Sequence, residues 1–436
     1  MAVFPGKLYT KAELEATDGL QTIAGINGNP PRCFRCGNRD DFGKMPCLCG
    51  KKDCLYCRRC IQMGRVNACT TLFYRKSEEE APSRRTFLEW QGDLSEAQQQ
   101  ASERIVQAVV EKKPLLLWAV AGSGKTEMLF AGIDRALQNG ERVALATPRV
   151  DVCLELQPRL EAAFPHVSKC CLYGGSEEKY LGERFVIATT HQLVRYYRAF
   201  DTVFIDEVDA FPYSQDPLLA YAVDKAAKEK CTQIYITATP TRTWQQECAT
   251  GLRDHVKIPA RYHGYPLPVP IAVWIGNWQR RLKKGKLPFQ IKTWLDMILS
   301  KNKPVLLFFP SITLMKKSYP LFQAAYKDVE SVYAEDPERK SKVEKLRQGK
   351  IQLLLTTTIL ERGVTFPNVQ VGVIGAEEAV FSESALVQIA GRVGRKTEYP
   401  QGEICFFHYG KSLAICRAIS QINEMNRLAR EAGLLR

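Results

Sequence analysis

The sequence predicts an α/β protein in which a small cysteine-rich module precedes two tandem lobes, each built on a parallel β-sheet. Short apolar runs alternate with helical stretches through most of the chain, as is typical of parallel sheets. A glycine-rich loop lies between one apolar run and a helical pattern. Eight of the 15 cysteines fall within residues 33–69. We expect the three parts to span residues 1–85, 86–262 and 263–436.

Composition and charge narrow the class of protein. The 436 residues carry a net charge of +14, with a pI near 9.1, which suggests a polyanionic partner. The hydrophobic share of 45% and the charged share of 25% are ordinary for globular proteins. No stretch approaches about 18 consecutive apolar residues, and the first residues lack the apolar core of a signal peptide. We therefore expect an intracellular chain without a transmembrane helix.

The cysteine-rich part contains the spacings of zinc-binding knuckles, Cys33-x-x-Cys36 and Cys54-x-x-Cys57-x-x-Cys60. Two knuckles place four thiolates so that they can close a tetrahedron around Zn²⁺. The first pair can join Cys54 and Cys57, leaving 17 residues between the pairs, or Cys57 and Cys60, leaving 20. Cys47 and Cys49 could also compete. Four thiolates leave no open coordination position, so the pattern favours a structural zinc site.

Basic and aromatic side chains are interleaved with these cysteines. Proteins that bind single-stranded nucleic acid use such a mixture to pair with phosphates and to stack on bases. The same residues also fit a solvated basic face on a small module whose few aromatic residues form its core. The residues concerned are Arg32, Phe34, Arg35, Arg39, Phe42, Lys51, Lys52, Tyr56, Arg58, Arg59 and Arg65.

A polar, proline-containing stretch at 76–85 predicts a boundary. The next helix is expected over residues 97–111, with Ser95 as its N-cap. Gln98, which precedes the phosphate-binding region, is placed to read adenine through its side-chain amide, and an ordinary helix-surface role is the alternative.

The loop Ala119-Val-Ala-Gly-Ser-Gly-Lys-Thr-Glu127 predicts a nucleotide-phosphate site between a buried strand at 114–120 and a helix at 128–137. Its glycines let backbone N–H groups surround a phosphate, and the helix N-terminus adds its dipole. Lys125 is expected to reach the β- and γ-phosphates, and the Thr126 hydroxyl to hold Mg²⁺. Ala119 occupies the position of the first glycine in the strict phosphate-loop pattern. Loops with alanine at this position occur in helicase-like ATPases, so the substitution indicates that class of nucleotide-binding protein. The expected nucleotide-binding residues of this loop are Ala121, Gly122, Ser123, Gly124, Lys125, Thr126 and Glu127.

Four more apolar runs predict strands at 142–147, 185–189, 201–205 and 233–236, with helices expected at 151–163 and 216–229. Residues at the C-terminal ends of parallel strands line one crevice. Asp206 and Glu207 occupy such a position, where Asp206 can bind Mg²⁺ and Glu207 can orient and deprotonate the attacking water. Acidic pairs after strands also serve as loop caps, but the distance of 81 residues from Lys125 favours the catalytic role.

A proline-rich linker is expected at 255–270, followed by an exposed basic run at 280–286. The second lobe is predicted from strands at 303–309, 351–355 and 371–374. The string Gln388-Ile-Ala-Gly-Arg392-Val-Gly-Arg395 is expected at a helix start, with both arginines on one side. Two guanidinium groups aimed together suit the γ-phosphate of a nucleotide bound to the other lobe, as arginine fingers.

This succession resembles the superfamily 2 helicases over roughly residues 90–410. The matching strings are the phosphate loop, Asp206-Glu-Val-Asp209, Thr237-Ala-Thr239, Glu361-Arg-Gly363 and Gln388-x-x-Gly-Arg-x-Gly-Arg395. The resemblance implies two RecA-like lobes that bind Mg·ATP between them, with Thr237-Ala-Thr239 coupling hydrolysis to lobe closure. It also implies that Gly363 and Gln388 take part in nucleotide binding.

The cysteine module and four further strings resemble the ComFA family of late-competence proteins of Gram-positive bacteria. The strings are residues 147–156, 188–193, 206–212 and 358–366. The resemblance implies a motor that uses ATP, Mg²⁺ and Zn²⁺ to take up transforming single-stranded DNA at the inner face of the cytoplasmic membrane. It also implies partners: other competence proteins, including a ComFC-type protein, the membrane DNA channel and further copies of the chain.

The family's second knuckle reads Tyr-Cys-Arg-x-Cys followed by basic residues, which matches Tyr56-Cys-Arg-Arg-Cys60. The resemblance therefore selects Cys33, Cys36, Cys57 and Cys60 as zinc ligands and leaves Cys47, Cys49 and Cys54 as extra cysteines.

The sequence thus predicts an ATP-driven single-stranded DNA translocase, in which Lys125, Asp206, Glu207, Arg392 and Arg395 carry the catalysis. Its expected contacts with the DNA backbone are Arg149, Thr190, His191, Ser311 and Thr358, at strand ends or in the loops that follow. One alternative is a duplex-separating helicase for repair or replication restart, similar to the PriA helicases. Another is a zinc-dependent DNA-binding scaffold with an ATP switch.

Overall fold

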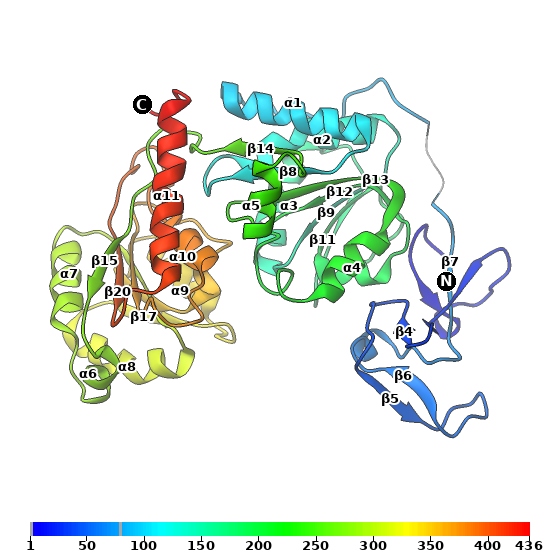
Figure 1. The fold of residues 1–436 in the computed structure, drawn as a ribbon, viewed down its shortest axis with the longest axis horizontal. Helices are drawn as coiled ribbons and strands as arrows, with labels where there is room; N and C mark the ends of the chain where they lie inside the picture. The colour runs from blue at the N-terminus through cyan, green and yellow to red at the C-terminus, as the bar shows by residue number, and fades with distance from the viewer. Residues whose placement is uncertain (1–2, 78–80) are drawn as a thin grey trace. The chain divides into compact units, whose positions relative to one another are not determined.

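The computed structural model describes residues 3–77 and 81–436. Contacts between Cα atoms divide the chain into two compact units (Figure 1). The first unit is Met1–Trp118 with Lys125–Val256, and the second is Ala119–Gly124 with Lys257–Arg436. The predicted boundary at 76–85 includes residues 78–80, which lie outside the described residues. Within the described part of the chain, no helix is both long and apolar enough to cross a membrane.

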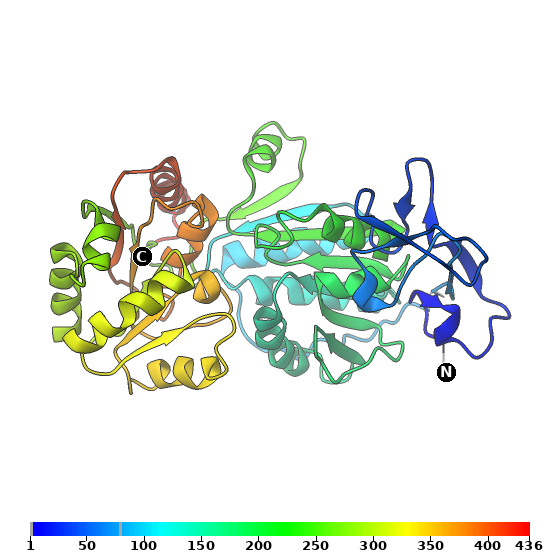
Figure 2. The ribbon, with the colours of Figure 1, turned by 90° about the horizontal axis from the view of Figure 1, so that it is seen from below.

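The N-terminal module is made of short antiparallel strands. One sheet has the order β1-β7-β2, and two hairpins pair β3 with β4 and β5 with β6. The strands are β1 (Tyr9–Thr10), β2 (Gln21–Ala24), β3 (Ile26–Asn27), β4 (Arg32–Cys33), β5 (Phe42–Met45), β6 (Cys54–Cys57) and β7 (Thr71–Tyr74). In both views the module (blue) lies on the side of the first lobe that carries α4 (Figure 1, Figure 2).

The first lobe is a seven-stranded sheet with the order β10-β11-β9-β12-β13-β8-β14. Its strands are β8 (Leu115–Ala119), β9 (Val143–Thr147), β10 (Lys169–Leu172), β11 (Phe185–Thr189), β12 (Phe200–Ile205), β13 (Ala227–Thr237) and β14 (His255–Ile258). Strands β8, β9 and β11 are buried along their whole length, because helices cover both faces of a parallel sheet. This architecture confirms the predicted fold class for the first lobe.

Five α-helices belong to this lobe: α1 (Glu96–Glu111), α2 (Lys125–Gln138), α3 (Val150–Ala163), α4 (Pro217–Ala226) and α5 (Arg242–Ala249). Helix α1 packs along α2 (Figure 1). Gly132 permits this approach, since a Cβ there would lie 2.5 Å from Cγ2 of Ile105.

Two segments of this lobe were predicted with the wrong boundaries. The helix predicted over 216–229 stops at Ala226, and the chain continues as β13 because Ala227 pairs with Phe200 of β12. The predicted linker at 255–270 begins with strand β14, an edge strand of the sheet beside β8.

The second lobe is a six-stranded parallel sheet with the order β15-β20-β19-β16-β18-β17. Its strands are β15 (Ile271–Trp274), β16 (Val305–Phe308), β17 (Val329–Val332), β18 (Leu353–Thr356), β19 (Gln370–Ile374) and β20 (Ile404–His408). Its α-helices are α6 (Trp278–Lys283), α7 (Phe289–Ser300), α8 (Ile312–Ala325), α9 (Arg339–Arg347), α10 (Glu383–Ala390) and α11 (Leu413–Glu431).

Both faces of this sheet are buried. Leu306 and Phe308 of β16 join one apolar cluster, while Val305 and Leu307 join another. Alternate residues of a strand point to opposite faces, so the continuous apolar run of β16 is explained by helices on both sides. The second lobe therefore also has the predicted parallel architecture.

Candidate functional site

Three neighbouring strands of the first lobe carry the predicted phosphate and magnesium residues. Strands β12, β13 and β8 are adjacent and parallel. Their C-terminal ends therefore lie at one edge of the sheet, where ligands of open α/β sheets bind. The phosphate loop follows β8, Asp206 and Glu207 follow β12, and Thr237-Ala-Thr239 begins at the end of β13.

The phosphate loop has the backbone that its glycines predict. Gly122 and Gly124 have φ angles of 84° and 77°, in the left-handed region that favours glycine. Helix α2 begins at Lys125 directly after the loop, so its N-terminal N–H groups follow the glycine turn. Ala121, Ser123 and Thr126 are buried, and the Glu127 carboxylate pairs with Arg159. This combination fits a bound phosphate group.

Glu207 has an unusual backbone. Its φ angle of 54° places a non-glycine residue in the left-handed region, at a cost of about 1–3 kcal/mol. Its N–H donates to Oδ1 of Asp206 at 2.8 Å. Strain of this kind persists where the surroundings hold a side chain in a required position. The two predicted acidic residues are thus held together in one tight turn.

Asp209 is a site residue that the sequence analysis did not single out. Its carboxylate accepts hydrogen bonds from Oγ1 of Thr237 and Oγ1 of Thr239, both at 2.6 Å. The Asp-Glu-Val-Asp turn after β12 is therefore joined to the Thr-Ala-Thr turn after β13. The presence of both strings in the sequence was the available signal, but their side-chain contact depends on the adjacency of the two strands.

Gln98, predicted to read adenine, lies in the first turn of α1 and is 6% exposed. Its Oε1 accepts from the Ser95 N–H at 2.8 Å, while Oγ of Ser95 accepts from the Gln98 N–H at 3.4 Å. The two residues thus form a capping box, so that Gln98 has a structural role in starting α1.

The five predicted DNA contacts have different surroundings. Four reach the surface: Arg149, His191, Ser311 and Thr358. Arg149 pairs with Asp151 through two nitrogens, at 3.1 and 3.0 Å, and Oγ of Ser311 caps α8. Thr190 is fully buried. Partial loss of hydration lowers the pKa of His191, with Asp216 opposing the shift.

The predicted helix start at Gln388–Arg395 was wrong. Helix α10 ends at Ala390, so Gln388 lies in its last turn and both arginines follow the helix. Gly391 caps the helix and Gly394, with φ of 73°, turns the chain away. Glycines at these two positions favour a turn over a continuing helix.

Arg392 and Arg395 have different environments. Arg392 is 2% exposed, and its Nε donates to the carbonyl oxygen of Glu361 at 2.9 Å. Its Nη1 also donates to the carbonyl of Val364. Arg395 is only half-buried, and its Nε donates to the carbonyl of Gly391 at 2.9 Å. Arg392 therefore holds the turn that contains Gly363, while part of Arg395 reaches solvent.

Arg261, in the predicted linker, was not singled out from the sequence. It is 3% exposed and donates to the carbonyl oxygens of Ala121, Gly391, Val393 and Gly394, all within the second compact unit. Burial lowers its pKa to about 9, and Arg395 adds to the shift. No local pattern marks a buried arginine inside a proline-rich stretch.

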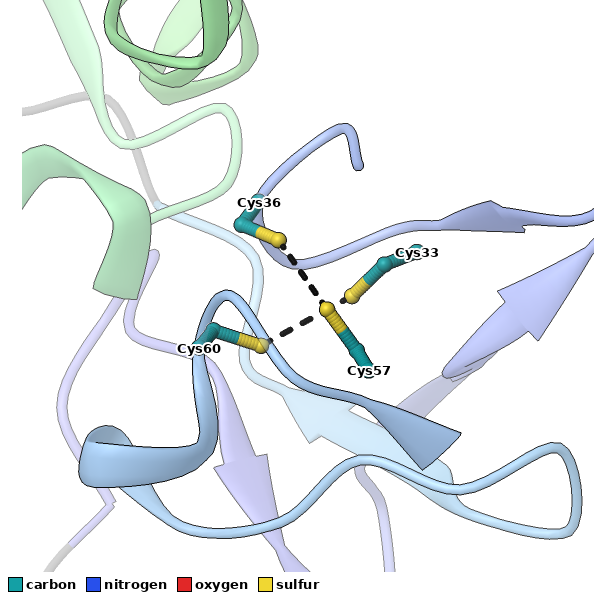
Figure 3. A group of neighbouring side chains, drawn as sticks. All are labelled: Cys33, Cys36, Cys57 and Cys60. Carbon is teal, nitrogen blue, oxygen red and sulfur yellow. Dashed lines mark hydrogen bonds between the residues drawn. The ribbon is translucent and has the colours of Figure 1, made fainter. Parts of the chain in front are cut away.

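The structure brings Cys33, Cys36, Cys57 and Cys60 into one buried group, with all four sulfur atoms within 4.8 Å of one another (Figure 3). The Sγ atoms of Cys33 and Cys60 are 3.8 Å apart, and those of Cys36 and Cys57 are 3.5 Å apart. Four sulfurs bound to one Zn²⁺ at about 2.3 Å form a tetrahedron with edges of about 3.8 Å. The residues present therefore fit a structural zinc ion.

Two buried side chains donate to these sulfurs, as outer partners of metal ligands do. Nη2 of Arg35 lies 3.1 Å from Sγ of Cys60, and Nδ2 of Asn38 lies 3.4 Å from Sγ of Cys57. Cys54 stands at the other end of β6 from Cys57. Residues three apart in a strand point to opposite faces, which explains why Cys54 does not join this group.

The module docks on helix α4 of the first lobe. Nζ of Lys225 donates to the carbonyls of Arg35 and Val194, at 2.7 and 2.6 Å. The Tyr221 hydroxyl donates to the carbonyl of Phe34 at 2.7 Å. Burial lowers the pKa of Lys225 to about 7, against the opposing effect of the nearby cysteines. The module and the first lobe share one apolar cluster.

Docking divides the basic and aromatic residues of the module into two sets. Phe34 packs edge-on against Tyr197 with ring centroids 5.1 Å apart, and Arg32 lies 4.2 Å from the Tyr221 ring centroid. Phe34 and Phe42 pack against the apolar cluster that the module shares with the first lobe. The exposed set is Arg39, Lys51, Lys52, Arg58, Arg59 and Arg65.

Family models match three segments of the chain. The competence protein ComFA N-terminal domain matches residues 7–74. The model described as type III restriction enzyme, res subunit, matches residues 91–242, and the helicase conserved C-terminal domain matches residues 290–397. The second and third matches fall on the two parallel-sheet lobes.

Solved structures share the two-lobed fold. S. cerevisiae Dbp5 bound to RNA and ADP BeF3 superposes with a TM-score of 0.55 at 12% identity, covering 79% of this chain and 98% of that chain. Mycobacterium smegmatis helicase Lhr bound to ssDNA and AMP-PNP gives 0.54 at 17% identity, covering 77% and 50%. The likeness confirms two RecA-like lobes.

Relatives in sequence are much closer. Competence protein ComFA of Bacillus subtilis is 48% identical over 404 residues, which cover 93% of this chain and 87% of that protein. Competence protein ComFA of Streptococcus pneumoniae is 39% identical over 381 residues, covering 87% of each. Together with the helicase domains, these relatives make the chain an ATP-hydrolysing, helicase-like enzyme. The chain belongs to the ComFA family of competence proteins.

Proposed function

We propose that this protein is an ATP-driven motor that moves along single-stranded DNA and thereby powers the uptake of transforming DNA. The observation that carries the proposal is the link from Asp209 to Thr237 and Thr239. It joins the turn that holds Asp206 and Glu207 to the Thr-Ala-Thr turn after the neighbouring strand. A motor needs such a link, because ATP hydrolysis must cause a change of conformation outside the nucleotide site.

The first lobe supplies the residues that act on the nucleotide. Bound Mg·ATP supplies the phosphoanhydride bond that is broken and the cation that screens its charge. Lys125 neutralises the phosphate oxygens, while the Thr126 hydroxyl and the Asp206 carboxylate hold the cation. Glu207 orients the attacking water and accepts its proton, and its strained backbone supports a fixed position for this carboxylate.

The second lobe supplies positive charge. Arg395, half-buried at the surface of its turn, stabilises the charge that develops on the transferred phosphoryl group, as an arginine finger does. Arg392 was predicted to share that role. Its bonds to the carbonyls of Glu361 and Val364 support a positioning role, in which it shapes the turn around Gly363.

DNA is held by charged and polar groups along its backbone. The exposed basic residues of the N-terminal module, together with Arg149, His191, Ser311 and Thr358, supply these contacts. Zinc held by Cys33, Cys36, Cys57 and Cys60 stabilises the fold of the module. A ComFC-type protein and the membrane DNA channel are the proposed partners that bring the motor to the inner face of the membrane, and copies of the chain can associate with one another.

The deciding experiment is steady-state ATP turnover without nucleic acid and with single-stranded DNA, duplex DNA or RNA. We expect single-stranded DNA to stimulate turnover most. Lys125→Ala should abolish turnover and leave DNA binding intact, because the lysine acts only on phosphates. Lys179→Ala, which removes an exposed lysine of the same lobe, is the matched control and should behave as wild type.

Other outcomes would overturn the proposal. Equal or greater stimulation by duplex DNA or RNA would assign the protein to the general helicases. Absence of stimulation by any nucleic acid would favour a DNA-binding scaffold in which ATP acts as a slow switch.

A further inference from the structure

The eight cysteines of residues 33–69 form two separate groups of four. The second group consists of Cys47, Cys49, Cys54 and Cys69, and its sulfur atoms all lie within 4.8 Å of one another. It shares no residue with the first group, and within the described residues it is the second set of cysteines that meets this spacing. Cys69 has no place in a knuckle pattern, so the sequence alone does not reveal the group.

The distances in the second group match those of a zinc tetrahedron. Sγ of Cys69 lies 3.4 Å from Sγ of Cys47 and 3.8 Å from Sγ of Cys54. The tetrahedral edge for Zn²⁺ and four thiolates is about 3.8 Å, whereas a disulfide would bring two sulfurs to about 2.05 Å. An iron–sulfur cluster would separate its cysteines, because they bind different iron atoms.

The backbone around the second group repeats features of the first. In the first group the Gly37 N–H donates to the Cys33 carbonyl at 2.8 Å, and Gly37 has a φ of 80°. In the second, the Gly50 N–H donates to the Cys47 carbonyl at 3.0 Å, and Gly50 has a φ of 86°. Each pair of cysteines is thus followed by a glycine turn that directs both sulfurs to the same point.

Each group also has an asparagine donor at a sulfur. Nδ2 of Asn67 lies 3.6 Å from Sγ of Cys47, as Nδ2 of Asn38 lies 3.4 Å from Sγ of Cys57. Asn67 is fixed by Thr70, whose Oγ1 accepts from the Asn67 N–H at 2.8 Å. Amide donors of this kind orient thiolate ligands and reduce their charge.

Strand β6 provides one ligand to each group. Its first residue, Cys54, belongs to the second group, and its last residue, Cys57, belongs to the first. The two side chains leave the strand on opposite faces. The loop between β5 and β6 contributes Cys47 and Cys49, together with exposed Lys51 and Lys52, whose charge offsets that of a tetrathiolate.

We propose that Cys47, Cys49, Cys54 and Cys69 bind a second zinc ion, which fastens the β5–β6 loop to the segment that enters β7. Four convergent thiolates, a glycine turn and an amide donor form a complete tetrahedral site for a borderline-soft cation. This site does not depend on the proposed DNA motor, since it concerns the construction of the module alone.

The test is metal analysis of the full chain purified in a reducing buffer with zinc. We expect about two zinc ions per chain for the wild type and about one for Cys49→Ser/Cys69→Ser. Cys49 and Cys69 are exposed, so the variant should fold and retain the first ion, which serves as an internal check. Cys416→Ser removes an exposed cysteine of α11 and should retain both ions.

Cobalt gives an independent readout. In the wild type, Co²⁺ should produce thiolate-to-metal absorption with about two equivalents bound, and the double variant should lose about half of the absorption. One zinc ion per wild-type chain, iron in place of zinc, or a disulfide between Cys47 and Cys69 in the reduced preparation would overturn the proposal. So would retention of two ions by the double variant.

Discussion

The two lobes use their charged residues differently. In the first lobe, Asp206 and Glu207 lie in the turn after β12, and Lys125 begins α2 after the phosphate loop that follows β8, where a ligand can reach them. In the second lobe, Arg261, Arg362 and Arg392 are 3%, 1% and 2% exposed. Arg261 and Arg392 donate to backbone carbonyl oxygens, and Arg362 donates to Oγ of Ser384 at 3.3 Å.

This difference shows that an arginine-rich string need not be a phosphate-binding string. A guanidinium group offers five donors in a fixed fork, and several carbonyls can be held by one side chain. Arg261, Arg362 and Arg392 are buried and bond within the lobe, whereas Arg395, which lies three residues after Arg392, is only half-buried. The comparison separates strand-end residues that a ligand can reach in the first lobe from buried arginines that bond within the second lobe.

Replacing Arg395 tests this division most directly. Arg395→Ala should lower kcat for ATP hydrolysis about 1000-fold, because an arginine finger stabilises charge in the transition state. ATP affinity and thermal stability should change little. Stopped-flow turnover and ATP titration measure the two quantities, with Arg430→Ala as an exposed control on α11.

The matched variant is Arg392→Ala. It should remove the Nε and Nη1 donors that Arg392 gives to the carbonyls of Glu361 and Val364, and reduce the free energy of unfolding by about 3 kcal/mol. If Arg392→Ala instead kept full stability and lost turnover as strongly as Arg395→Ala, the two arginines would act together and the comparison would fail.

The next largest effect concerns the link within the first lobe. Asp209→Asn weakens the acceptor for Thr237 and Thr239, and should reduce the stimulation of turnover by single-stranded DNA about tenfold. Turnover without DNA should fall less. Thr239→Ser keeps the hydroxyl and should behave as wild type, whereas equal loss of basal and stimulated turnover in Asp209→Asn would contradict a coupling role.

The smallest expected effect is a pH dependence of stability that arises from His263 in the second lobe. His263 is 3% exposed, its Nε2–H donates to the Gly394 carbonyl at 3.0 Å, and Nδ1 accepts from the Tyr265 N–H at 3.2 Å. Burial is the main cause that lowers its pKa. The neutral His263 ring contributes fully to the free energy of unfolding above the pKa of the unfolded chain, near 6.5. This contribution is lost as the pH falls through the pKa of the folded protein.

His263→Gln should therefore flatten the fall in stability below about pH 6.5, by no more than about 1.4 kcal/mol per pH unit. Thermal unfolding of both proteins between neutral and mildly acidic pH measures the difference. His191 and His408, whose pKa values burial also lowers, are present in both proteins and cancel in the comparison. Parallel stability curves would show that His263 does not titrate on unfolding.

Sequence reasoning located five of the seven strands of the first lobe and the phosphate loop, because each of these is encoded locally, and it missed β10 and β14. An apolar run followed by Gly122 and Gly124 specifies a strand and a tight turn with little help from the rest of the chain. The strand ends at β8, β9 and β11 lie within one residue of those predicted. The parallel direction of the strands was predicted from the alternation of apolar runs with helical stretches, whereas the order of the strands was not predicted.

What sequence reasoning missed depends on tertiary contacts. Arg261 gains its role from carbonyls of residues 391–394, about 130 positions away. Strand β14 forms because β8 offers a sheet edge, in spite of the prolines that follow. The helix expected at Arg392 does not form because α10 ends at Ala390, and Gly391 and Gly394, which favour a turn, are visible in the sequence.

The shared core of the N-terminal module and the first lobe has a consequence for truncation studies. A chain that started at residue 86 would lack the partners of Tyr197, Tyr221 and Lys225 and would expose the apolar cluster beneath them. Such a chain would tend to aggregate. Loss of activity after deletion would then report poor solubility, and the contribution of the module to DNA binding is better measured by changing single exposed arginines such as Arg59.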